Sequence, residues 1–491
     1  MDPTGSDATA WLDRWWDDRA GMVLYPSTVG SPTNPYQRPG VHLVRESAAY
    51  AVALLSRGAP GDVVRAERAL GNVLDHQIDE PRSVAHGTWR RAPGEPLPGA
   101  SPREWIDYDP NWREFVGTAF ALALAHDSEL SPGCVARMEA ALRKACEGTL
   151  VRGVSPEYTN IALMSAFLLD WTGDRLGEPA WREAGAALGN AVADAYETSG
   201  AFPEHNSPTY YGIDLYGVAL WRARARSDRL RERGAALEAA LWRDLARFYH
   251  AGLRNLCGPY TRAYGMDMTR YVATLGCWIA PLVPEGRAPL PPFGDGVPDA
   301  HDLFELPLVA ALEARAPAEV AGELAAFAGP RTVEQRITDA PGRVATATLR
   351  ESAMWGGEHA SGRFVHWQHH PATIHWRAGE GRVGWARLVA NAPVDVVADA
   401  RGLDARVHTG LPGLREADLH VWLECSAPPR AGPDVVAGVL VFPGLELRCT
   451  SEPKRALEEE GGGSLAPYRV GFRLPAGTAR PTMRLRLDVE S

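Results

Sequence analysis

The chain has 491 residues, of which 45% are apolar and 23% are charged, and its formal net charge at neutral pH is −10. This composition is typical of a packed globular protein and excludes a disordered chain, and the length predicts two or three domains. The negative charge argues against a general nucleic-acid or anionic-membrane binder, although a local arginine cluster can still bind an anionic small substrate.

The chain carries no visible targeting or membrane signal. Its first residues, MDPTGSDATAWLDRWWDDRAG, lack a basic segment followed by an apolar one, and no apolar run reaches membrane-spanning length. The six cysteines form no CxxC pair and most lie in apolar runs, so we expect buried thiols in a reducing compartment. These features predict a cytoplasmic protein.

The first two thirds of the chain are predicted to be helical, because apolar residues recur at three- and four-residue spacing between turns rich in Gly, Pro and Asp. Short connections favour antiparallel helix pairs. Residues 1–330 are therefore expected to form an (α/α) toroid, an incomplete barrel of helix hairpins, with a Pro- and Gly-rich connector at about 279–302. The predicted helices are 48–58, 114–127, 134–150, 160–173, 181–200, 214–227 and 237–256.

Residues 331–491 are predicted to form an antiparallel β-sandwich, because their segments tend to alternate with period two and are rich in Val, Leu, Arg and Trp. The predicted fold class is thus α+β and multidomain. The expected strands are 343–350, 363–370, 373–379, 381–390, 393–400, 418–426, 435–444, 445–451, 468–477 and 482–491.

Two polar clusters stand at the starts of predicted helices. Tyr158 and Asn160 form the first, and the second, fifty positions later, is Glu204–Tyr211. In a toroid the starts of alternate helices gather at one end, so Asn160 and Tyr210 are expected to face one cleft.

The alternative is that these clusters supply N-caps, with Asn160 in the first and Asn206 or Ser207 in the second. A cap does not explain two adjacent tyrosines beside His205 and Glu204. Tyr is not a capping residue, and its hydroxyl needs a partner when it is buried.

Two further clusters combine charged and aromatic residues. The segment GPYTRAYGMDMTRY contains Tyr260, Arg262, Tyr264, Asp267 and Arg270. Its arginines suit recognition of a carboxylate, and the alternative is an internal Arg–Asp pair that holds a loop. The segment IDYDPNWREF contains Asp107, Asp109, Asn111, Trp112 and Arg113, and it fits either a sugar cleft or an ordinary helix cap.

Four histidines, His366, His369, His370 and His375, lie within ten positions in the first predicted strands. On one strand His366 and His370 share a face and His369 points to the other, so the spacing does not imply a three-histidine metal site. A single catalytic or substrate-binding histidine is favoured over a metal, and the alternative is solvated or cross-strand-paired histidines.

Two segments together resemble the heparinase II/III and alginate-lyase superfamily of polysaccharide lyases. They are NIALMSAFLLDWTGDRLGEPAW and GAFPEHNSPTYYGIDLYGVAL. In that superfamily an Asn begins a helix, and a Gly, a Glu and a Ser-Pro-x-Tyr segment follow roughly fifty residues later. The resemblance continues through PPFGDG at 291–296 to the histidine-rich strands, and so covers residues from about 158 to 375.

The resemblance implies an (α/α) toroid followed by a β-sandwich, with the cleft between them, and β-elimination at a uronic acid. Carried over by motif, Tyr210 is the base or acid, Asn160 neutralises the substrate carboxylate, and His370 or His369 is the third member. His205 and Tyr264 are expected to substitute for missing members. The expected substrate-binding residues are Glu204, Asn206, Tyr211, Arg262, Arg270, Asp109, Trp112 and His369.

The chain departs from the superfamily pattern at three places. Many members have His where this chain has Ile161 and Tyr211, and HHPATIH lacks the Asp of the usual His-x-His-x-Asp strand. No metal and no cofactor are therefore expected, and the expected partner is an oligosaccharide substrate, with no nucleic acid and no membrane.

Two other functions remain open at this point. A glycoside hydrolase on the same toroid would use two carboxylates from among Glu204, Asp107 and Asp109. A carbohydrate-binding protein without activity could use some of the chain's many tryptophans for stacking on sugars, although Trp171 and Trp242 lie in helical apolar patterns that favour the core.

Overall fold

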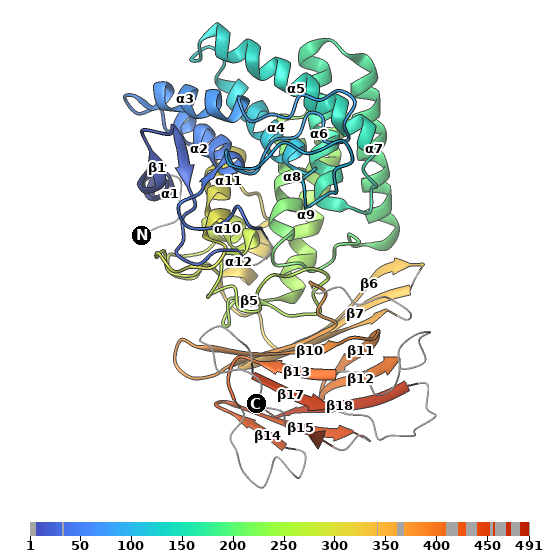
Figure 1. Ribbon diagram of the computed structural model, residues 1–491. Helices are drawn as coiled ribbons and strands as arrows, with labels where there is room; N and C mark the ends of the chain where they lie inside the picture. Colours follow the sequence, from blue (N-terminus) through green and yellow to red (C-terminus); the bar gives the residue numbers. More distant parts are fainter. Residues whose placement is uncertain are drawn as a thin grey trace. The chain divides into compact units, whose positions relative to one another are not determined.

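The structure is a computed structural model that describes residues 6–31, 34–340, 342–360, 368–408, 421–428, 439–451, 455–456, 468–472 and 482–490 (Figure 1). Its contacts divide the chain into two compact units. The helical unit comprises Met1–Ala195, Tyr210–Leu241 and Met268–Pro317. The sheet unit comprises Tyr196–Thr209, Trp242–Asp267 and Ala318–Ser491. The single boundary expected between residues 330 and 331 stays a prediction.

A helix forms in each segment where the apolar spacing predicts one, and the described part of the chain also contains five α-helices outside those segments. The α-helices are α1 (Ser6–Leu12), α2 (Val44–Arg57), α3 (Asp62–Leu74), α4 (Trp112–Ala123), α5 (Pro132–Arg152), α6 (Thr159–Leu176), α7 (Pro179–Ser199), α8 (Tyr211–Arg224), α9 (Asp228–Phe248), α10 (Thr274–Ile279), α11 (Leu306–Leu312) and α12 (Ala318–Ala325). The 3-10 helices are η1 (Asp13–Trp15), η2 (Leu124–His126), η3 (Ala280–Leu282) and η4 (Ala300–Glu305).

Burial separates inner helices from outer ones. In α6 every residue from Thr159 to Gly173 is buried, whereas α3 buries Asp62, Ala66, Ala69, Leu70 and Val73 and little else. A helix that is apolar on all sides belongs inside a protein, and one with a single apolar stripe covers its outside. The sequence of α6 therefore fits the inner layer, and that of α3 the outer layer.

The inner helices close into a ring, which confirms the predicted toroid. Contacts run from α2 to α4, α6 and α8, then to α10 and α11, and α11 returns to α2. Arg45, near the start of α2, lies over the ring of Trp112 at the start of α4. A side chain at Gly212, near the start of α8, would meet Thr274 at the start of α10. Neighbouring inner helices thus begin at the same end of the ring.

The sheet unit is a sandwich of antiparallel strands. The larger sheet has the order β16-β17-β13-β10-β9-β8-β7-β6, and the smaller one has the order β11-β12-β18-β15-β14. The strands are β6 (Arg331–Asp339), β7 (Gly342–Leu349), β8 (Ala353–Ala360), β9 (Ala372–Arg377), β10 (Val383–Ala390), β11 (Val394–Asp399), β12 (Gly402–His408), β13 (Val421–Cys425), β14 (Val439–Phe442), β15 (Leu445–Ser451), β16 (Arg455–Ala456), β17 (Tyr468–Phe472) and β18 (Thr482–Glu490). Short strands elsewhere are β1 (Trp16–Asp17), β2 (Met22–Leu24), β3 (His42–Leu43), β4 (Tyr249–His250) and β5 (Asn255–Leu256).

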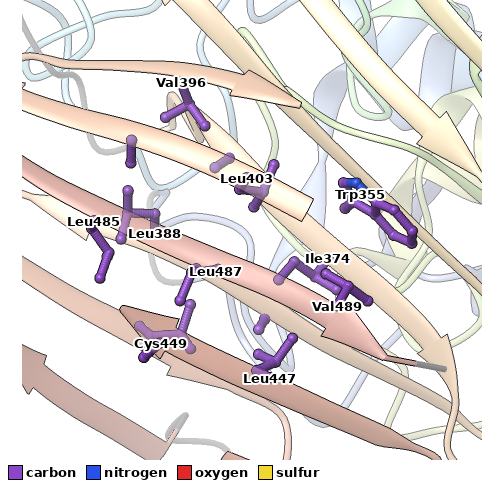
Figure 2. Close-up of a cluster of buried hydrophobic side chains, with 14 of the residues drawn as sticks. Trp355, Ile374, Leu388, Val396, Leu403, Leu447, Cys449, Leu485, Leu487 and Val489 are labelled. Carbon is purple, nitrogen blue, oxygen red and sulfur yellow. The ribbon is translucent and has the colours of Figure 1, made fainter. Parts of the chain in front are cut away.

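The apolar core of the sandwich comes from both sheets. Figure 2 shows Trp355, Ile374 and Leu388 from the larger sheet in one cluster with Leu403 and Leu487 from the smaller. Burial alternates along β10, as the period-two pattern of its sequence predicts. The predicted β-sandwich is therefore confirmed.

Among the described strands of the sandwich, β6, β8, β12 and β16 were not among the predicted ones. In β8 the pair Gly356–Gly357 interrupts the apolar alternation that marks a strand. A Cβ at Gly356 would lie 1.7 Å from the carbonyl oxygen of Gly258, so only glycine permits the loop that contains Gly258 to cross the sheet here.

Among the described residues, no helix is long and apolar enough to cross a membrane. The cysteines are free thiols, and Cys146, Cys257, Cys277, Cys425 and Cys449 are buried as expected. Cys134 is only partly buried, because it lies in the first turn of α5, where the helix is exposed.

Candidate active site

The alternative interpretation, in which Asn160 and Asn206 or Ser207 are N-caps, is wrong. Tyr158 occupies the N-cap position of α6, and Tyr210 that of α8, and neither makes a side-chain capping bond. Asn160 lies inside the first turn of α6 and is 1% exposed. The N-cap positions are therefore occupied by tyrosines and not by the asparagine or serine of the capping interpretation.

In the helical unit, α6 and α8 pack side by side with their starts at the same end. A Cβ at Gly217 would lie 2.5 Å from the Cβ of Leu163. Further along both helices, the backbone N–H of Arg226, just after α8, donates to Asp170 of α6 at 2.6 Å, so the two helices run in the same direction. Each helical residue adds about 1.5 Å along the axis. Measured from the contacting pair Gly217 and Leu163, Tyr210 therefore lies about one helical turn further than Asn160 toward the N-terminal ends of the two helices. Tyr210 is partly exposed, and Tyr211 is buried at 1% exposure.

A second group at this end of the ring surrounds the start of α4. The amide of Asn111 donates to the hydroxyl of Tyr158 at 2.9 Å, and Arg152 donates to the Asn111 carbonyl oxygen at 2.9 Å. The backbone N–H of Asn111 donates to Asp109 at 2.9 Å. Burial raises the pKa of Asp109 to about 6 although this hydrogen bond lowers it. Trp112 is buried under Arg45.

In the sheet unit, the segment before Tyr210 lies along the loop that follows α9. The amide of Asn206 donates to the carbonyl oxygens of Cys257 and Pro259 at 2.6 and 2.7 Å, and Ser207 donates to that of Arg262. Asn206 has φ of 53°, a left-handed conformation that Asn tolerates better than most residues. The hydrogen bonds of Asn206 and Ser207 thus hold the segment before Tyr210 against the loop that follows α9.

Arg262 is the central cation of this region. Its guanidinium donates to Glu204 at 2.6 Å and to the side-chain oxygen of Gln368 at 2.8 Å. The Arg262 side chain is 23% exposed, whereas that of Glu204 is 8% exposed. The expected binding residues Glu204 and Arg262 are therefore joined to each other in an ion pair.

The predicted histidines of the sheet unit are buried. His205 lies 3.3 Å from Asp244, and His369 Nε2 lies 3.3 Å from Glu358. His370 Nε2 lies 3.3 Å from the guanidinium of Arg387, which can only donate. Burial and the Arg387 charge hold the pKa of His370 well below its ordinary range, so this imidazole is neutral at neutral pH.

The strand predicted for residues 363–370 does not extend through its last three residues. Gln368 and His369 lie outside strands, and His370 pairs with Tyr260 in an isolated bridge. His366 lies outside the described residues. His375, in β9, is close to the carbonyl oxygen of Met266 at 2.7 Å.

Tyr264 and Arg270 are the exposed members of the predicted set. Tyr264 is 36% exposed, and its backbone N–H donates to the hydroxyl of Thr209 at 3.2 Å. Arg270, in the helical unit, is exposed in a turn before α10. Both side chains are therefore open to a ligand.

Several residues that form hydrogen bonds in this region were not predicted from the sequence. Buried Glu358 accepts from both Arg343 and His369, and Arg343 also donates to Thr261 at 2.9 Å. Burial alone would raise the pKa of Glu358, but the hydrogen bond from His369 and the Arg343 charge lower it well below its usual range. In the sequence, this group is indicated only by a charged residue within an apolar strand. Among the described residues, no three His, Cys, Asp or Glu side chains are arranged to hold a metal ion.

Comparison with known proteins gives one family and a set of distant structures. The matching family model is described as a domain of unknown function (DUF8769) and covers residues 6–314. No curated protein matches the chain. A crystal structure of heparinase III shares 9% identity with a TM-score of 0.40, over 99% of this chain and 85% of that one.

Two other solved structures are similarly distant. A mutant of the heparan sulfate lyase HepC from Pedobacter heparinus shares 11% identity, with a TM-score of 0.35, over 99% of this chain and 83% of that one. A heparinase III with methylated lysines shares 12% identity, with a TM-score of 0.36, over 100% of this chain and 84% of that one. Because identities and TM-scores are low, the activity of this chain is inferred from its own residues.

Proposed function

This chain belongs to the family described as a domain of unknown function (DUF8769), and we propose that it is a lyase that cleaves a uronic-acid-containing oligo- or polysaccharide by β-elimination. The observation that carries the proposal is the common start of α6 and α8, which places Asn160 and Tyr210 at one end of the helical ring. The order and spacing of their motifs match those of the polysaccharide lyases that the sequence resembles.

The chemistry explains why an amide and a phenol suit this reaction. The proton on the carbon next to a uronate carboxylate is weakly acidic, so its removal needs a partner that stabilises the negative charge developing on the carboxylate. Asn160 is proposed to donate its amide hydrogens to that carboxylate. Tyr210, in its phenolate form, is proposed to take the proton, after which the bond to the leaving oxygen breaks and a carbon–carbon double bond forms.

The leaving oxygen must gain a proton, and no water is consumed. Tyr264 is the more accessible candidate for this step because it is 36% exposed. His370 is the alternative, with His369 and His205 as further candidates, although the lowered pKa of His370 makes it the weaker proton donor at neutral pH. Arg270 is proposed to attract the anionic substrate, together with Arg262, whose charge Glu204 offsets.

The test follows the ultraviolet absorbance of the conjugated uronate product. Purified protein is incubated with oligosaccharides of alginate, oligogalacturonate, heparosan and hyaluronan. Absorbance should rise with at least one of them, and Tyr210→Phe should slow the rise by about 10²- to 10⁴-fold. Tyr216→Phe is the matched control, because Tyr216 lies on the same helix and bonds Thr118 at 3.0 Å inside the ring. Full activity of Tyr210→Phe would remove Tyr210 from the mechanism.

One observation favours hydrolysis as a second candidate. The raised pKa of Asp109, about 6, suits a general acid that is still partly protonated near neutral pH. Asp107 is a poorer acid, because the hydrogen bond from Arg103 lowers its pKa. New reducing ends without ultraviolet absorbance, lost in Asp109→Asn, would establish this reaction in place of elimination.

A further inference from the structure

Trp105 is a large aromatic side chain held out in solvent. Its exposed fraction is 55%, and that of the neighbouring Ile106 is 60%. By contrast Trp89, Trp221 and Trp242 are fully buried. Exposure of an indole gives up the favourable free energy of its burial, so the position of Trp105 calls for an explanation beyond packing.

The backbone of Trp105 is strained as well. Its φ is 60°, a left-handed conformation that is rare for a residue with a bulky side chain and costs of order 1 kcal/mol or more. Glycine would adopt this conformation without that cost. The chain thus keeps a tryptophan where a smaller residue would fold more easily.

A buried arginine fixes this strained turn. The Arg91 guanidinium donates to the carbonyl oxygens of Trp105 and Ile106 at 3.3 and 3.0 Å. Arg91 is 4% exposed and is held by Glu95, whose carboxylate accepts from its Nε at 2.6 Å. Arg91 also lies over the ring of Tyr36 at 4.8 Å. Two carbonyl groups of an exposed turn are therefore tied to a rigid, buried support.

The same turn leads directly to the start of α4. Asp109 follows Trp105 by four residues, so it lies within about 14 Å of it along the chain. Asp109 holds the backbone of Asn111, and Asn111 bonds Tyr158 at the start of α6. Trp105 therefore stands beside the end of the ring at which Asn160 and Tyr210 begin their helices.

We propose that Trp105 is a sugar-binding platform, on which the indole face stacks against a pyranose ring of the oligosaccharide. This inference rests on the proposed function and names a contact that its substrate makes. A pyranose presents an apolar C–H face surrounded by hydroxyl groups. Trp105 and Ile106 present a small apolar surface beside Arg103, which is paired with Asp107 at 3.2 Å but whose side chain is 68% exposed, so part of its guanidinium is open to hydroxyl groups. A rigid turn also lowers the entropic cost of binding.

The test measures binding by calorimetry with hexasaccharides of alginate, oligogalacturonate, heparosan and hyaluronan. Trp105→Ala and Trp105→Gly should weaken binding of the hexasaccharide that the unaltered protein binds by about tenfold or more, and Trp105→Phe by much less. Trp105→Gly relieves the left-handed strain, so its melting temperature should be unchanged or higher. Its loss of binding then cannot come from unfolding. Val64→Ala, at an exposed position on α3, is the control.

The outcomes separate this inference from the proposed function. Equal binding by Trp105→Gly and the unaltered protein overturns the platform. A dimer that dissociates in Trp105→Ala, with sugar binding unchanged, overturns it in favour of a protein interface. Binding that depends on Trp105 but yields no unsaturated product supports the platform and overturns the lyase. Failure of the unaltered protein to bind any of the four hexasaccharides overturns both.

Discussion

The side-chain amide of Asn111 donates a hydrogen bond of 2.9 Å to the hydroxyl of Tyr158, and this bond joins the starts of α4 and α6. Tyr158→Phe removes it, and we expect a loss of about 1 kcal/mol in the free energy of unfolding. Elimination should also slow several-fold, because Asn160 lies two residues further on. Thermal unfolding and initial rates measure the two effects, with Tyr468→Phe, at an exposed strand position, as the control.

Asn160→Asp keeps the shape of the side chain but replaces its donor with an anion. If Asn160 holds the substrate carboxylate as charge develops, kcat should fall by about 10²- to 10³-fold. Steady-state kinetics on the active oligosaccharide provide the measurement. A kcat within a factor of two of the unaltered protein, in a folded variant, would exclude this role for Asn160.

Glu305 couples the stability of the helical ring to pH. It lines a small cavity with Arg45, His301 and Tyr216, and burial raises its pKa to about 8 from an ordinary 4.5, with Arg45 opposing the rise and Asp302 adding to it. The folded state thus keeps a proton that the unfolded chain has released. Stability should fall as pH rises from about 5 to 8 and stay reduced above that.

Glu305→Gln removes this proton and should flatten the dependence. Urea unfolding midpoints measured across this pH range compare the variant with the unaltered protein. Burial also raises the pKa of Asp302 to about 6 and that of Asp299 to about 7, so part of the slope should remain below pH 7. An unchanged slope above pH 7 would contradict the assignment to Glu305.

Arg343 and Glu358 form a buried pair within the sheet unit, with their nearest atoms 2.8 Å apart. Arg343→Leu should destabilise the protein by about 3 to 5 kcal/mol, because it leaves the Glu358 carboxylate buried without this cation. The double variant Arg343→Leu with Glu358→Leu should lose less than the sum of the two single variants. Additive losses in chemical unfolding would show that the pair is not coupled.

Gly356 marks the crossing of the loop over β8. A Cβ there would lie 1.7 Å from the Gly258 carbonyl oxygen, so Gly356→Ala should cost about 3 kcal/mol or more. Gly322, on α12 in the same unit, has open space around it, and Gly322→Ala should instead stabilise by about 0.5 to 1 kcal/mol. Thermal unfolding of the two variants gives the comparison. Equal stability of both would contradict the close approach.

The hydrophobic pattern of the sequence predicted both the helical toroid and the β-sandwich, because the helical repeat and the strand repeat each span only a few residues. The 3.6-residue repeat identified α4, α6 and α8, and the alternation identified β10. The strand β8 was not predicted, because its glycines interrupt the apolar alternation of a strand. They are required by the close contact with the loop that contains Gly258. The capping interpretation of Asn206 failed because its amide reaches Cys257 and Pro259, some fifty residues away.

The sequence by itself determined that helices come first and antiparallel strands second, and that polar groups gather at the starts of α6 and α8. Only the tertiary structure decided which charges are paired. Glu204 meets Arg262, Glu358 meets Arg343 and His369, and Arg91 reaches the carbonyl oxygen of Trp105. A buried charge or a strained backbone is tolerable only where distant segments supply its partners. Those partners lie many residues apart, so no local period reveals them.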